Sequence, residues 1–128
     1  MFFVSLHIKE SPQRGRGVYA LEAISSGDWI EEAPVIVLSA QERVLIDQTK
    51  LHDYIFEWTP EGTSQCIMAL GYVPIYNHHY HSNAEYFMDY EQQLIRIIAV
   101  KDIAAGEEIC INYNGDADNL KPLWFEVK

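Results

Sequence analysis

The sequence predicts a mainly β fold of the α+β class, built from many short strands with one helical insert. Apolar residues alternate with a period of two near both ends of the chain, which is the pattern of half-buried strands. Turn-forming residues divide the chain into short runs, and a helix-start signature lies in the middle. Because 128 residues is the length of one domain, we expect residues 1–128 to form a single unit.

The first third of the chain is predicted to consist of short strands separated by turns. Residues 3–8 alternate between apolar and polar positions, so one face of that strand is apolar. Residues 11–17 are rich in turn formers and are expected to be a loop, and a second turn is expected at 25–28. Extended segments are expected at residues 3–8, 18–20, 29–32 and 35–38.

The middle of the chain changes to a helical pattern and the last third returns to strands. Ser39 followed three residues later by Glu42 is a capping box, which predicts a helix start and a helical insert at about residues 40–72. Residues 94–100 are a near-continuous apolar run typical of a buried strand. Residues 108–113 alternate again before the chain reaches a turn.

Charge and cysteine content limit the classes of partner and compartment. The net charge is −10, from 19 acidic and 9 basic residues, and phosphate binding needs clustered Lys and Arg. Nucleic acid and an anionic membrane are therefore disfavoured as the main partner. The negative charge can be explained either by a basic partner or by its contribution to solubility. Cys66 and Cys110 are too few for a disulfide scaffold. With no signal peptide or apolar span visible, we expect a soluble intracellular protein that is cytoplasmic, nuclear or located in a host cell.

Four segments, taken in order, carry a resemblance to a known family. They are Gly15–Ala20, Gly27–Glu32, Tyr76–His78 with Asn83 and Ala84, and Val100–Ile109 closing at Tyr113. This set resembles the SET domain of protein-lysine methyltransferases over residues 8–115, and most closely the small stand-alone SET proteins of viruses and bacteria. The resemblance implies several small curved sheets, a knot-like C-terminal crossing, and a tail at 116–128.

The resemblance also implies a cofactor, S-adenosylmethionine, with S-adenosylhomocysteine as the product. In the family the Gly-x-Gly loop cradles the methionine end of the cofactor, and the Asn-His pair lies beside its adenosine and amino-acid parts. An aromatic residue after the core motif packs over the adenine. The residues expected to bind the cofactor are therefore Gly15, Arg16, Gly17, Asn77, His78 and Trp124.

Tyr113 is the expected catalytic residue, because the family's tyrosine at this position sits where methyl donor and substrate lysine meet. A lysine with a pKa of ~10.4 in water must lose a proton before it attacks the methyl group, so the site needs alignment and oxygen dipoles. The lysine channel is expected to involve Tyr54, with Tyr72 and Tyr76 as further candidates for the channel or for the adenine side. Ile111 stands where relatives carry Phe or Tyr, and without a hydroxyl it favours more than one methylation.

Other interpretations stay open at this point. The glycine loop can be an ordinary turn, Tyr54 and Tyr113 can be packing residues, and Trp124 can contact a partner or the core. The chain can also be a catalytically silent SET-like interaction module. A small metal-binding domain is a third alternative, but adjacent histidines on a strand point to opposite faces, so no metal is expected at His78, His79 and His81. The expected partners are a Lys-rich, histone-like substrate and a second copy of the chain.

Overall fold

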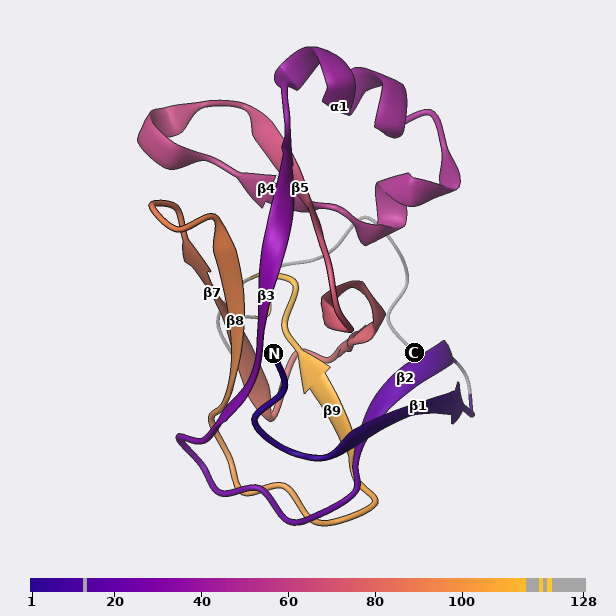
Figure 1. The fold of residues 1–128 in the computed structure, drawn as a ribbon. Helices are drawn as coiled ribbons and strands as arrows, with labels where there is room; N and C mark the ends of the chain where they lie inside the picture. Colours follow the sequence, from indigo (N-terminus) through magenta and orange to yellow (C-terminus); the bar gives the residue numbers. More distant parts are fainter. Residues whose placement is uncertain (13, 115–117, 119, 121–128) are drawn as a thin grey trace.

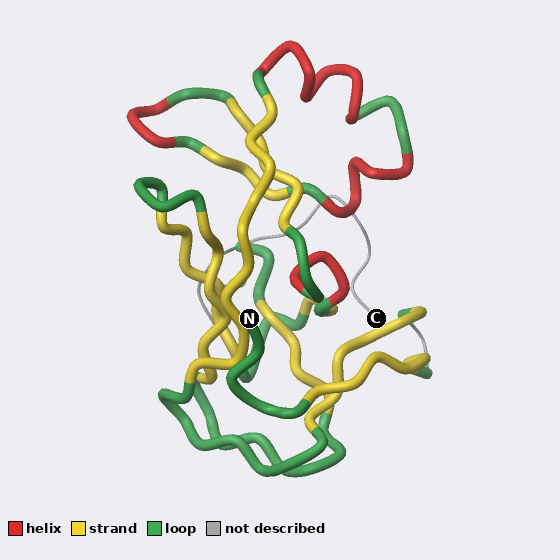
Figure 2. Tube along the Cα trace, viewed as in Figure 1, coloured by secondary structure: helices red, strands yellow, loops and turns green. Residues whose placement is uncertain are grey.

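The computed structural model describes residues 1–12, 14–114, 118 and 120. Figure 1 shows the strands curving through the molecule with the α-helix at the top of the view, and Figure 2 shows the same trace coloured by type of structure, with one short helical turn in the middle of the molecule. The strands are β1 (Leu6–Ser11), β2 (Gly15–Ala20), β3 (Trp29–Leu38), β4 (Phe56–Trp58), β5 (Gln65–Ala69), β6 (Asn77–His78), β7 (Ala84–Asp89), β8 (Leu94–Ala99) and β9 (Glu108–Ile111). The helical elements are α1 (Ala40–Ile46) and three 3-10 helices, η1 (Lys50–Tyr54), η2 (Pro60–Gly62) and η3 (Val73–Ile75).

The strands follow the order β1-β2-β9-β7-β8-β3-β5-β4, and β6 pairs with β9 beside this path. Strand β3 is the longest of the described strands and belongs to two parts of the sheet. Its first half pairs with β8 and its second half with β5, both antiparallel. In Figure 1 it runs up the height of the molecule and leads directly into α1. This strand therefore connects the helical insert to the rest of the sheet.

The core is formed mainly by β-branched and small residues from the sheet. Strand β8 illustrates the pattern, because Ile95, Ile97 and Ala99 are fully buried while the residues between them are only partly covered. Period-two alternation of this kind places one face of a strand on the core. The fold class expected from the sequence is confirmed: the described chain is mainly β with one α-helix.

The expected loop at 11–17 is mostly strand. Strands β1 and β2 pair as far as Ser11 opposite Gly15, so only a tight turn separates them. Ser11 stabilises this turn, since its hydroxyl donates to the Gly15 carbonyl at 2.8 Å and accepts from the Arg14 amide at 3.2 Å. Gly15 adopts a φ of +72°, a conformation that glycine reaches without steric cost. The first strand correspondingly lies later than the predicted 3–8.

The insert expected at about 40–72 is only partly helical. Helix α1 begins as predicted, with reciprocal bonds between Ser39 and Glu42 of 2.9 and 3.1 Å. Beyond η1, however, β4 and β5 form a hairpin that returns to β3. The sequence did not predict this hairpin, because β4 is only three residues long and too short to show a period of two. Within the described residues, no helix has the length and apolar character required to cross a bilayer.

Strand β9 brings together segments that are far apart in the sequence. Its first residues pair with β2, Cys110 and Ile111 pair in parallel with Asn77 and His78 of β6, and Ile111 also pairs with Ala84 of β7. Parallel strands need long connections between them. Here the parallel neighbours β6 and β7 both pair with β9, the strand that leads to Tyr113. This is the C-terminal crossing that positions the site.

Candidate active site

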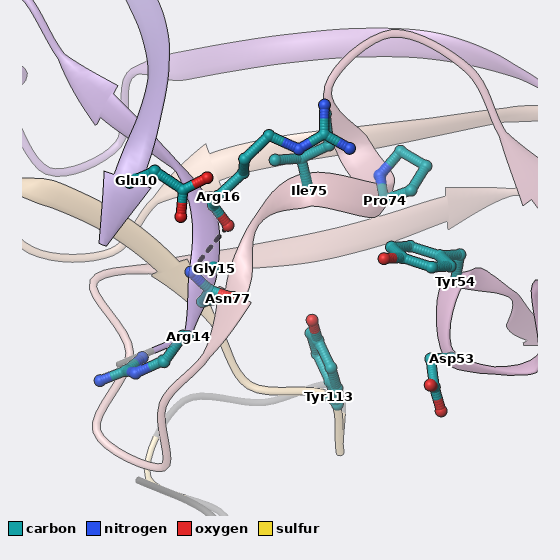
Figure 3. A pocket seen from close by; sticks show the side chains of 10 residues that line it. All are labelled: Glu10, Arg14, Gly15, Arg16, Asp53, Tyr54, Pro74, Ile75, Asn77 and Tyr113. Atoms are coloured by element: carbon teal, nitrogen blue, oxygen red, sulfur yellow. Dashed lines mark hydrogen bonds between the residues drawn. The ribbon is translucent and has the colours of Figure 1, made fainter. Parts of the chain in front are cut away.

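A cavity of about 590 Å³ opens where the β1–β2 hairpin, η1, η3 and the end of β9 converge. Figure 3 shows the residues around it, with Tyr113 on one side, Tyr54 and Asp53 on another, and Asn77 beside the hairpin. The lining residues are Glu10, Arg14, Gly15, Arg16, Asp53, Tyr54, Pro74, Ile75, Asn77 and Tyr113. The volume lies within the range of small-molecule pockets.

Arg14 fixes the hairpin tip to the crossing. Its Nη1 donates to the His78 carbonyl at 2.9 Å and approaches the Cys110 Sγ at 3.7 Å. These contacts join the turn before Gly15 to β6 and β9 at once. One wall of the cavity therefore has a defined position relative to the strand that carries Tyr113.

Asn77 is held by two acceptors on the facing strands. Its Nδ2 donates to the Glu108 Oε2 at 2.7 Å and to the Arg16 carbonyl at 3.2 Å. A Cβ added at Gly17 would lie 2.9 Å from this Nδ2 and would collide with the Glu108 carboxylate. Glycine at this position therefore provides the space for the Asn77–Glu108 pair, and the amide Oδ1 of Asn77 remains as an acceptor.

Tyr113 is fixed through both its side chain and its backbone. The hydroxyl donates to the Tyr76 carbonyl at 2.8 Å, and the amide donates to His78 Nδ1 at 2.9 Å. The Tyr113 carbonyl accepts from the Tyr86 hydroxyl at 3.1 Å, and the ring packs edge-on against Phe56 with centroids 6.3 Å apart. The phenol oxygen is thus presented to the cavity in one orientation.

The groups around Tyr113 are held in their neutral forms. Burial raises the pKa of the Tyr113 phenol well above its ordinary value. Burial, with a smaller contribution from neighbouring His79 and Arg14, lowers the pKa of His78 to about 4. Burial and the nearby Glu108 carboxylate raise the pKa of the Cys110 thiol to about 11. At neutral pH Tyr113 and these two buried neighbours are therefore uncharged.

The comparisons with known proteins identify the family. Residues 15–114 match the model of the SET domain, which is most of the chain. The chain belongs to the SET-domain family of protein-lysine methyltransferases. A Schizosaccharomyces pombe relative, named histone-lysine N-methyltransferase, H3 lysine-37 specific, is 36% identical over 122 residues, which cover 94% of this chain and 77% of the relative.

Solved structures agree with this SET-domain assignment. A Plasmodium falciparum protein, provisionally named a histone methyltransferase, is 28% identical with a TM-score of 0.68, covering 86% of this chain and 93% of that one. A chain of an active polycomb repressive complex 2 is 25% identical with a TM-score of 0.74. It covers 86% of this chain, whereas the matched part is only 15% of that chain.

Several residues expected to form the SET-domain site line the cavity together. Gly15, Arg16, Asn77, Tyr54 and Tyr113 all belong to its wall. They come from β2, η1, β6 and the segment after β9, separated by up to about 100 positions in the sequence, and the β9 crossing brings them to one place. Tyr54 lies at the end of η1 and is 40% exposed, so its ring borders solvent at the edge of the cavity.

Four other expected residues are not among those that line this cavity. The Tyr76 side chain is buried in the core, and only its carbonyl reaches Tyr113. Tyr72 stacks on Phe2 with ring centroids 4.6 Å apart. His78 and Ile111 are buried at the β6–β9 pairing. Gly17 acts on the wall through Asn77, and Trp124 lies outside the described residues.

The sequence interpretation missed half of the residues that line the SET-domain cavity. Arg14 and Asp53 directly adjoin the predicted Gly15 and Tyr54, so their charge beside those residues was an available signal. Glu10 had no local signal, because it faces the cavity only through its pairing opposite Arg16. The other two are Pro74 and Ile75 of η3.

The histidine cluster has local partners. The His81 amide donates to His79 Nδ1 at 3.0 Å, and His81 Nδ1 lies 2.7 Å from an Asp118 carboxylate oxygen. The rings of His79 and His81 are 6.1 Å apart. Across the described residues, no three His, Cys, Asp or Glu side chains are grouped as metal ligands.

Proposed function

We propose that this SET domain transfers a methyl group from S-adenosylmethionine to a lysine of a basic, histone-like protein and releases S-adenosylhomocysteine. The observation that carries the proposal is the orientation of the Tyr113 hydroxyl, held at 2.8 Å by the Tyr76 carbonyl on the wall of the cavity. The relative specific for lysine 37 of histone H3 supports a histone-like substrate. The net charge of −10 supports a Lys-rich one.

The lining residues suit the donor chemically. S-adenosylmethionine supplies, when bound, a methyl group activated by a sulfonium. The guanidinium groups of Arg14 and Arg16 suit a carboxylate, whereas the Asn77 Oδ1 and the Glu10 carboxylate suit an ammonium group. Gly15 allows the backbone to approach a ligand closely. We therefore assign the amino-acid end of the donor to the hairpin side of the cavity.

The opposite side of the cavity suits a lysine. The Tyr54 ring can pack along the aliphatic stem, and the Asp53 carboxylate attracts the cationic amine at the edge. Next to Tyr113, the neutral phenol and the uncharged buried groups behind it disfavour the ammonium form. Tyr113 stays protonated because burial raises its pKa, so we assign it as an oriented hydroxyl dipole that aligns the amine, and not as the base that removes the proton.

Labelled methyl transfer tests the proposal. The purified chain is incubated with methyl-labelled S-adenosylmethionine and histones, and the modified residue is mapped by mass spectrometry. Tyr113→Phe is expected to lower the turnover by about 10²- to 10³-fold, the effect of removing one preorganised polar group from an active site. Tyr90→Phe, which removes the hydroxyl of an exposed tyrosine packed on Trp58, is the matched control.

Two results would oppose the proposal. Wild-type turnover in the Tyr113→Phe protein would show that the Tyr113 hydroxyl has no role in methyl transfer. Histone-tail binding without transfer of label on any basic protein or peptide would instead favour the silent interaction module.

The proposal extends to the extent and assembly of the domain. We propose that residues 1–128 act as one SET domain with its substrate cleft formed by this chain, and that two copies associate as a homodimer. Light scattering at micromolar concentration measures the assembly directly. A monomeric mass would oppose the dimer and leave the methyl-transfer proposal unaffected.

A further inference from the structure

A buried carboxylate lies behind the wall of the cavity and has no role in the chemistry described so far. Glu31, on β3, is fully buried. Its Oε1 accepts a hydrogen bond from the Tyr76 hydroxyl and its Oε2 accepts one from the Tyr72 amide, both at 2.8 Å. One carboxylate thus holds both residues that flank η3.

The backbone is shaped to admit this carboxylate. Gly71, directly before Tyr72, has a φ of +66°, and a Cβ at this position would collide with the Glu31 Oε2. Burial raises the pKa of Glu31, and the hydrogen bonds from Tyr72 and Tyr76 oppose that increase. Burying such a group is costly unless it is hydrogen-bonded, and here both of its oxygens have a partner.

The carboxylate is connected to the reacting end of the cavity through one residue. Tyr76 binds Glu31 with its hydroxyl and accepts the Tyr113 hydroxyl with its carbonyl, at 2.8 Å in each case. The segment that Glu31 holds also carries Pro74 and Ile75 into the cavity wall. A displacement of the carboxylate therefore moves the acceptor that orients Tyr113.

We propose that Glu31 is a positioning residue for methyl transfer, which acts through Tyr76 to fix the orientation of the Tyr113 hydroxyl. This inference rests on the proposed function. Misplacing a reacting group by about 1 Å can lower a rate by about 100-fold, so the expected effect is on the rate of transfer, with donor binding on the hairpin side largely retained.

Glu31→Gln is the primary test, and Glu32→Gln is its matched control. Glu32 is the next residue of the same strand and is partly exposed. Its carboxylate forms an ion pair with Arg96, at a distance of 2.6 Å, and takes no part in the network around Glu31. We expect Glu31→Gln to lower the single-turnover rate at saturating donor and peptide by about 10- to 100-fold. The donor dissociation constant is expected to change by less than about threefold, and Glu32→Gln to retain the wild-type rate.

A Tyr113→Phe background distinguishes positioning from a general structural role. If Glu31 acts through the Tyr113 hydroxyl, removing that hydroxyl first leaves Glu31→Gln with a further loss of no more than about twofold. Losses that multiply fully in the double variant would overturn the inference. So would a Glu31→Gln protein with the wild-type single-turnover rate.

Two further variants keep the test decisive if Glu31→Gln fails to fold. Tyr76→Phe removes the same hydrogen bond from its other end, and Gly71→Ala displaces the carboxylate sterically. Both are expected to slow transfer in the same way, and a folded Tyr76→Phe protein with the wild-type rate would overturn the inference. A wild-type chain without methyl transfer would overturn the proposed function together with this inference, whereas an active wild type with unaffected variants would overturn the inference alone.

Discussion

Substitution of either glycine of the β1–β2 hairpin should destabilise the protein, but for a different physical reason at each position. Gly15 has a φ of +72° and open space around its missing Cβ, so the restriction is on the backbone. Gly17 has no such φ, but an added Cβ would meet the Asn77 amide at 2.9 Å, so the restriction is on volume. Alanine therefore strains the turn at one position and displaces a side-chain pair at the other.

The expected magnitudes follow from these contacts. Gly15→Ala places an L residue in the left-handed region, which costs about 1–2 kcal/mol. Gly17→Ala breaks the 2.7 Å bond between Asn77 and the Glu108 carboxylate, and a hydrogen bond to a charged group contributes about 1.5–3 kcal/mol. The free energy of unfolding from urea denaturation should fall by these amounts.

Asparagine separates the two explanations. Because Asn tolerates the left-handed conformation, Gly15→Asn should be more stable than Gly15→Ala. At Gly17 the larger side chain should make Asn worse than Ala. If Ala and Asn rank in the same order at both positions, the distinction between backbone and volume is refuted. Calorimetric titration with the donor should show weaker binding for Gly17→Ala, since Asn77 moves with the broken bond.

Four further predictions address pH, salt and product. The folded protein holds the pKa of His78 at about 4, below its ordinary value of about 6.5, and protonation removes the acceptor for the Tyr113 amide. The free energy of unfolding should therefore fall as the pH drops from about 6.5 to 4. His78→Asn, which keeps an acceptor, should flatten this dependence. An unchanged pH profile in this variant would contradict the assignment of the effect to His78. The KM for a Lys-rich peptide should rise with salt, less steeply in Asp53→Asn than in Asp47→Asn, and equal slopes would exclude Asp53 as the attracting group. Mass spectrometry of a saturated reaction should find di- or trimethyllysine because Ile111 has no hydroxyl, and monomethyl product alone would oppose this. The ascending limb of the pH–rate profile should move to lower pH with a thialysine peptide, whose amine is more acidic, and a fixed limb would instead indicate an enzyme group.

The sequence predicted the fold class because the determining signals are local. Alternation within β8 and the capping box at Ser39 each depend on residues a few positions apart, and both appear in the structure. The tip of the β1–β2 hairpin was harder to predict, because the extent of β1–β2 pairing depends on how Ser11 and Gly15 close the turn. The strands of the insert were overlooked, since the three residues of β4 are too short to show a period.

The cavity itself depends on contacts between distant residues. Glu10 faces it only because β1 and β2 are in one particular register, and Glu31 reaches the site through hydrogen bonds to residues 41 and 45 positions away. The adjacent Glu31 and Glu32 do carry a usable signal. On a strand, neighbouring side chains point to opposite faces, so one of two consecutive glutamates in a core strand is directed inward and needs partners there.

The distribution of charge around the cavity explains how one site could both attract a cation and react with a neutral amine. Glu10, Asp53 and the two arginines of the hairpin lie on the lining, whereas the phenol of Tyr113 and the thiol of Cys110 are held protonated and the His78 ring is held neutral. A lysine drawn in past the Asp53 carboxylate therefore reaches Tyr113, where the neighbouring buried groups are uncharged and Arg14 nearby adds repulsion. Loss of the proton is favoured by the surroundings as a whole, and Tyr113 is left with the task of alignment, for which a fixed, neutral hydroxyl is suited.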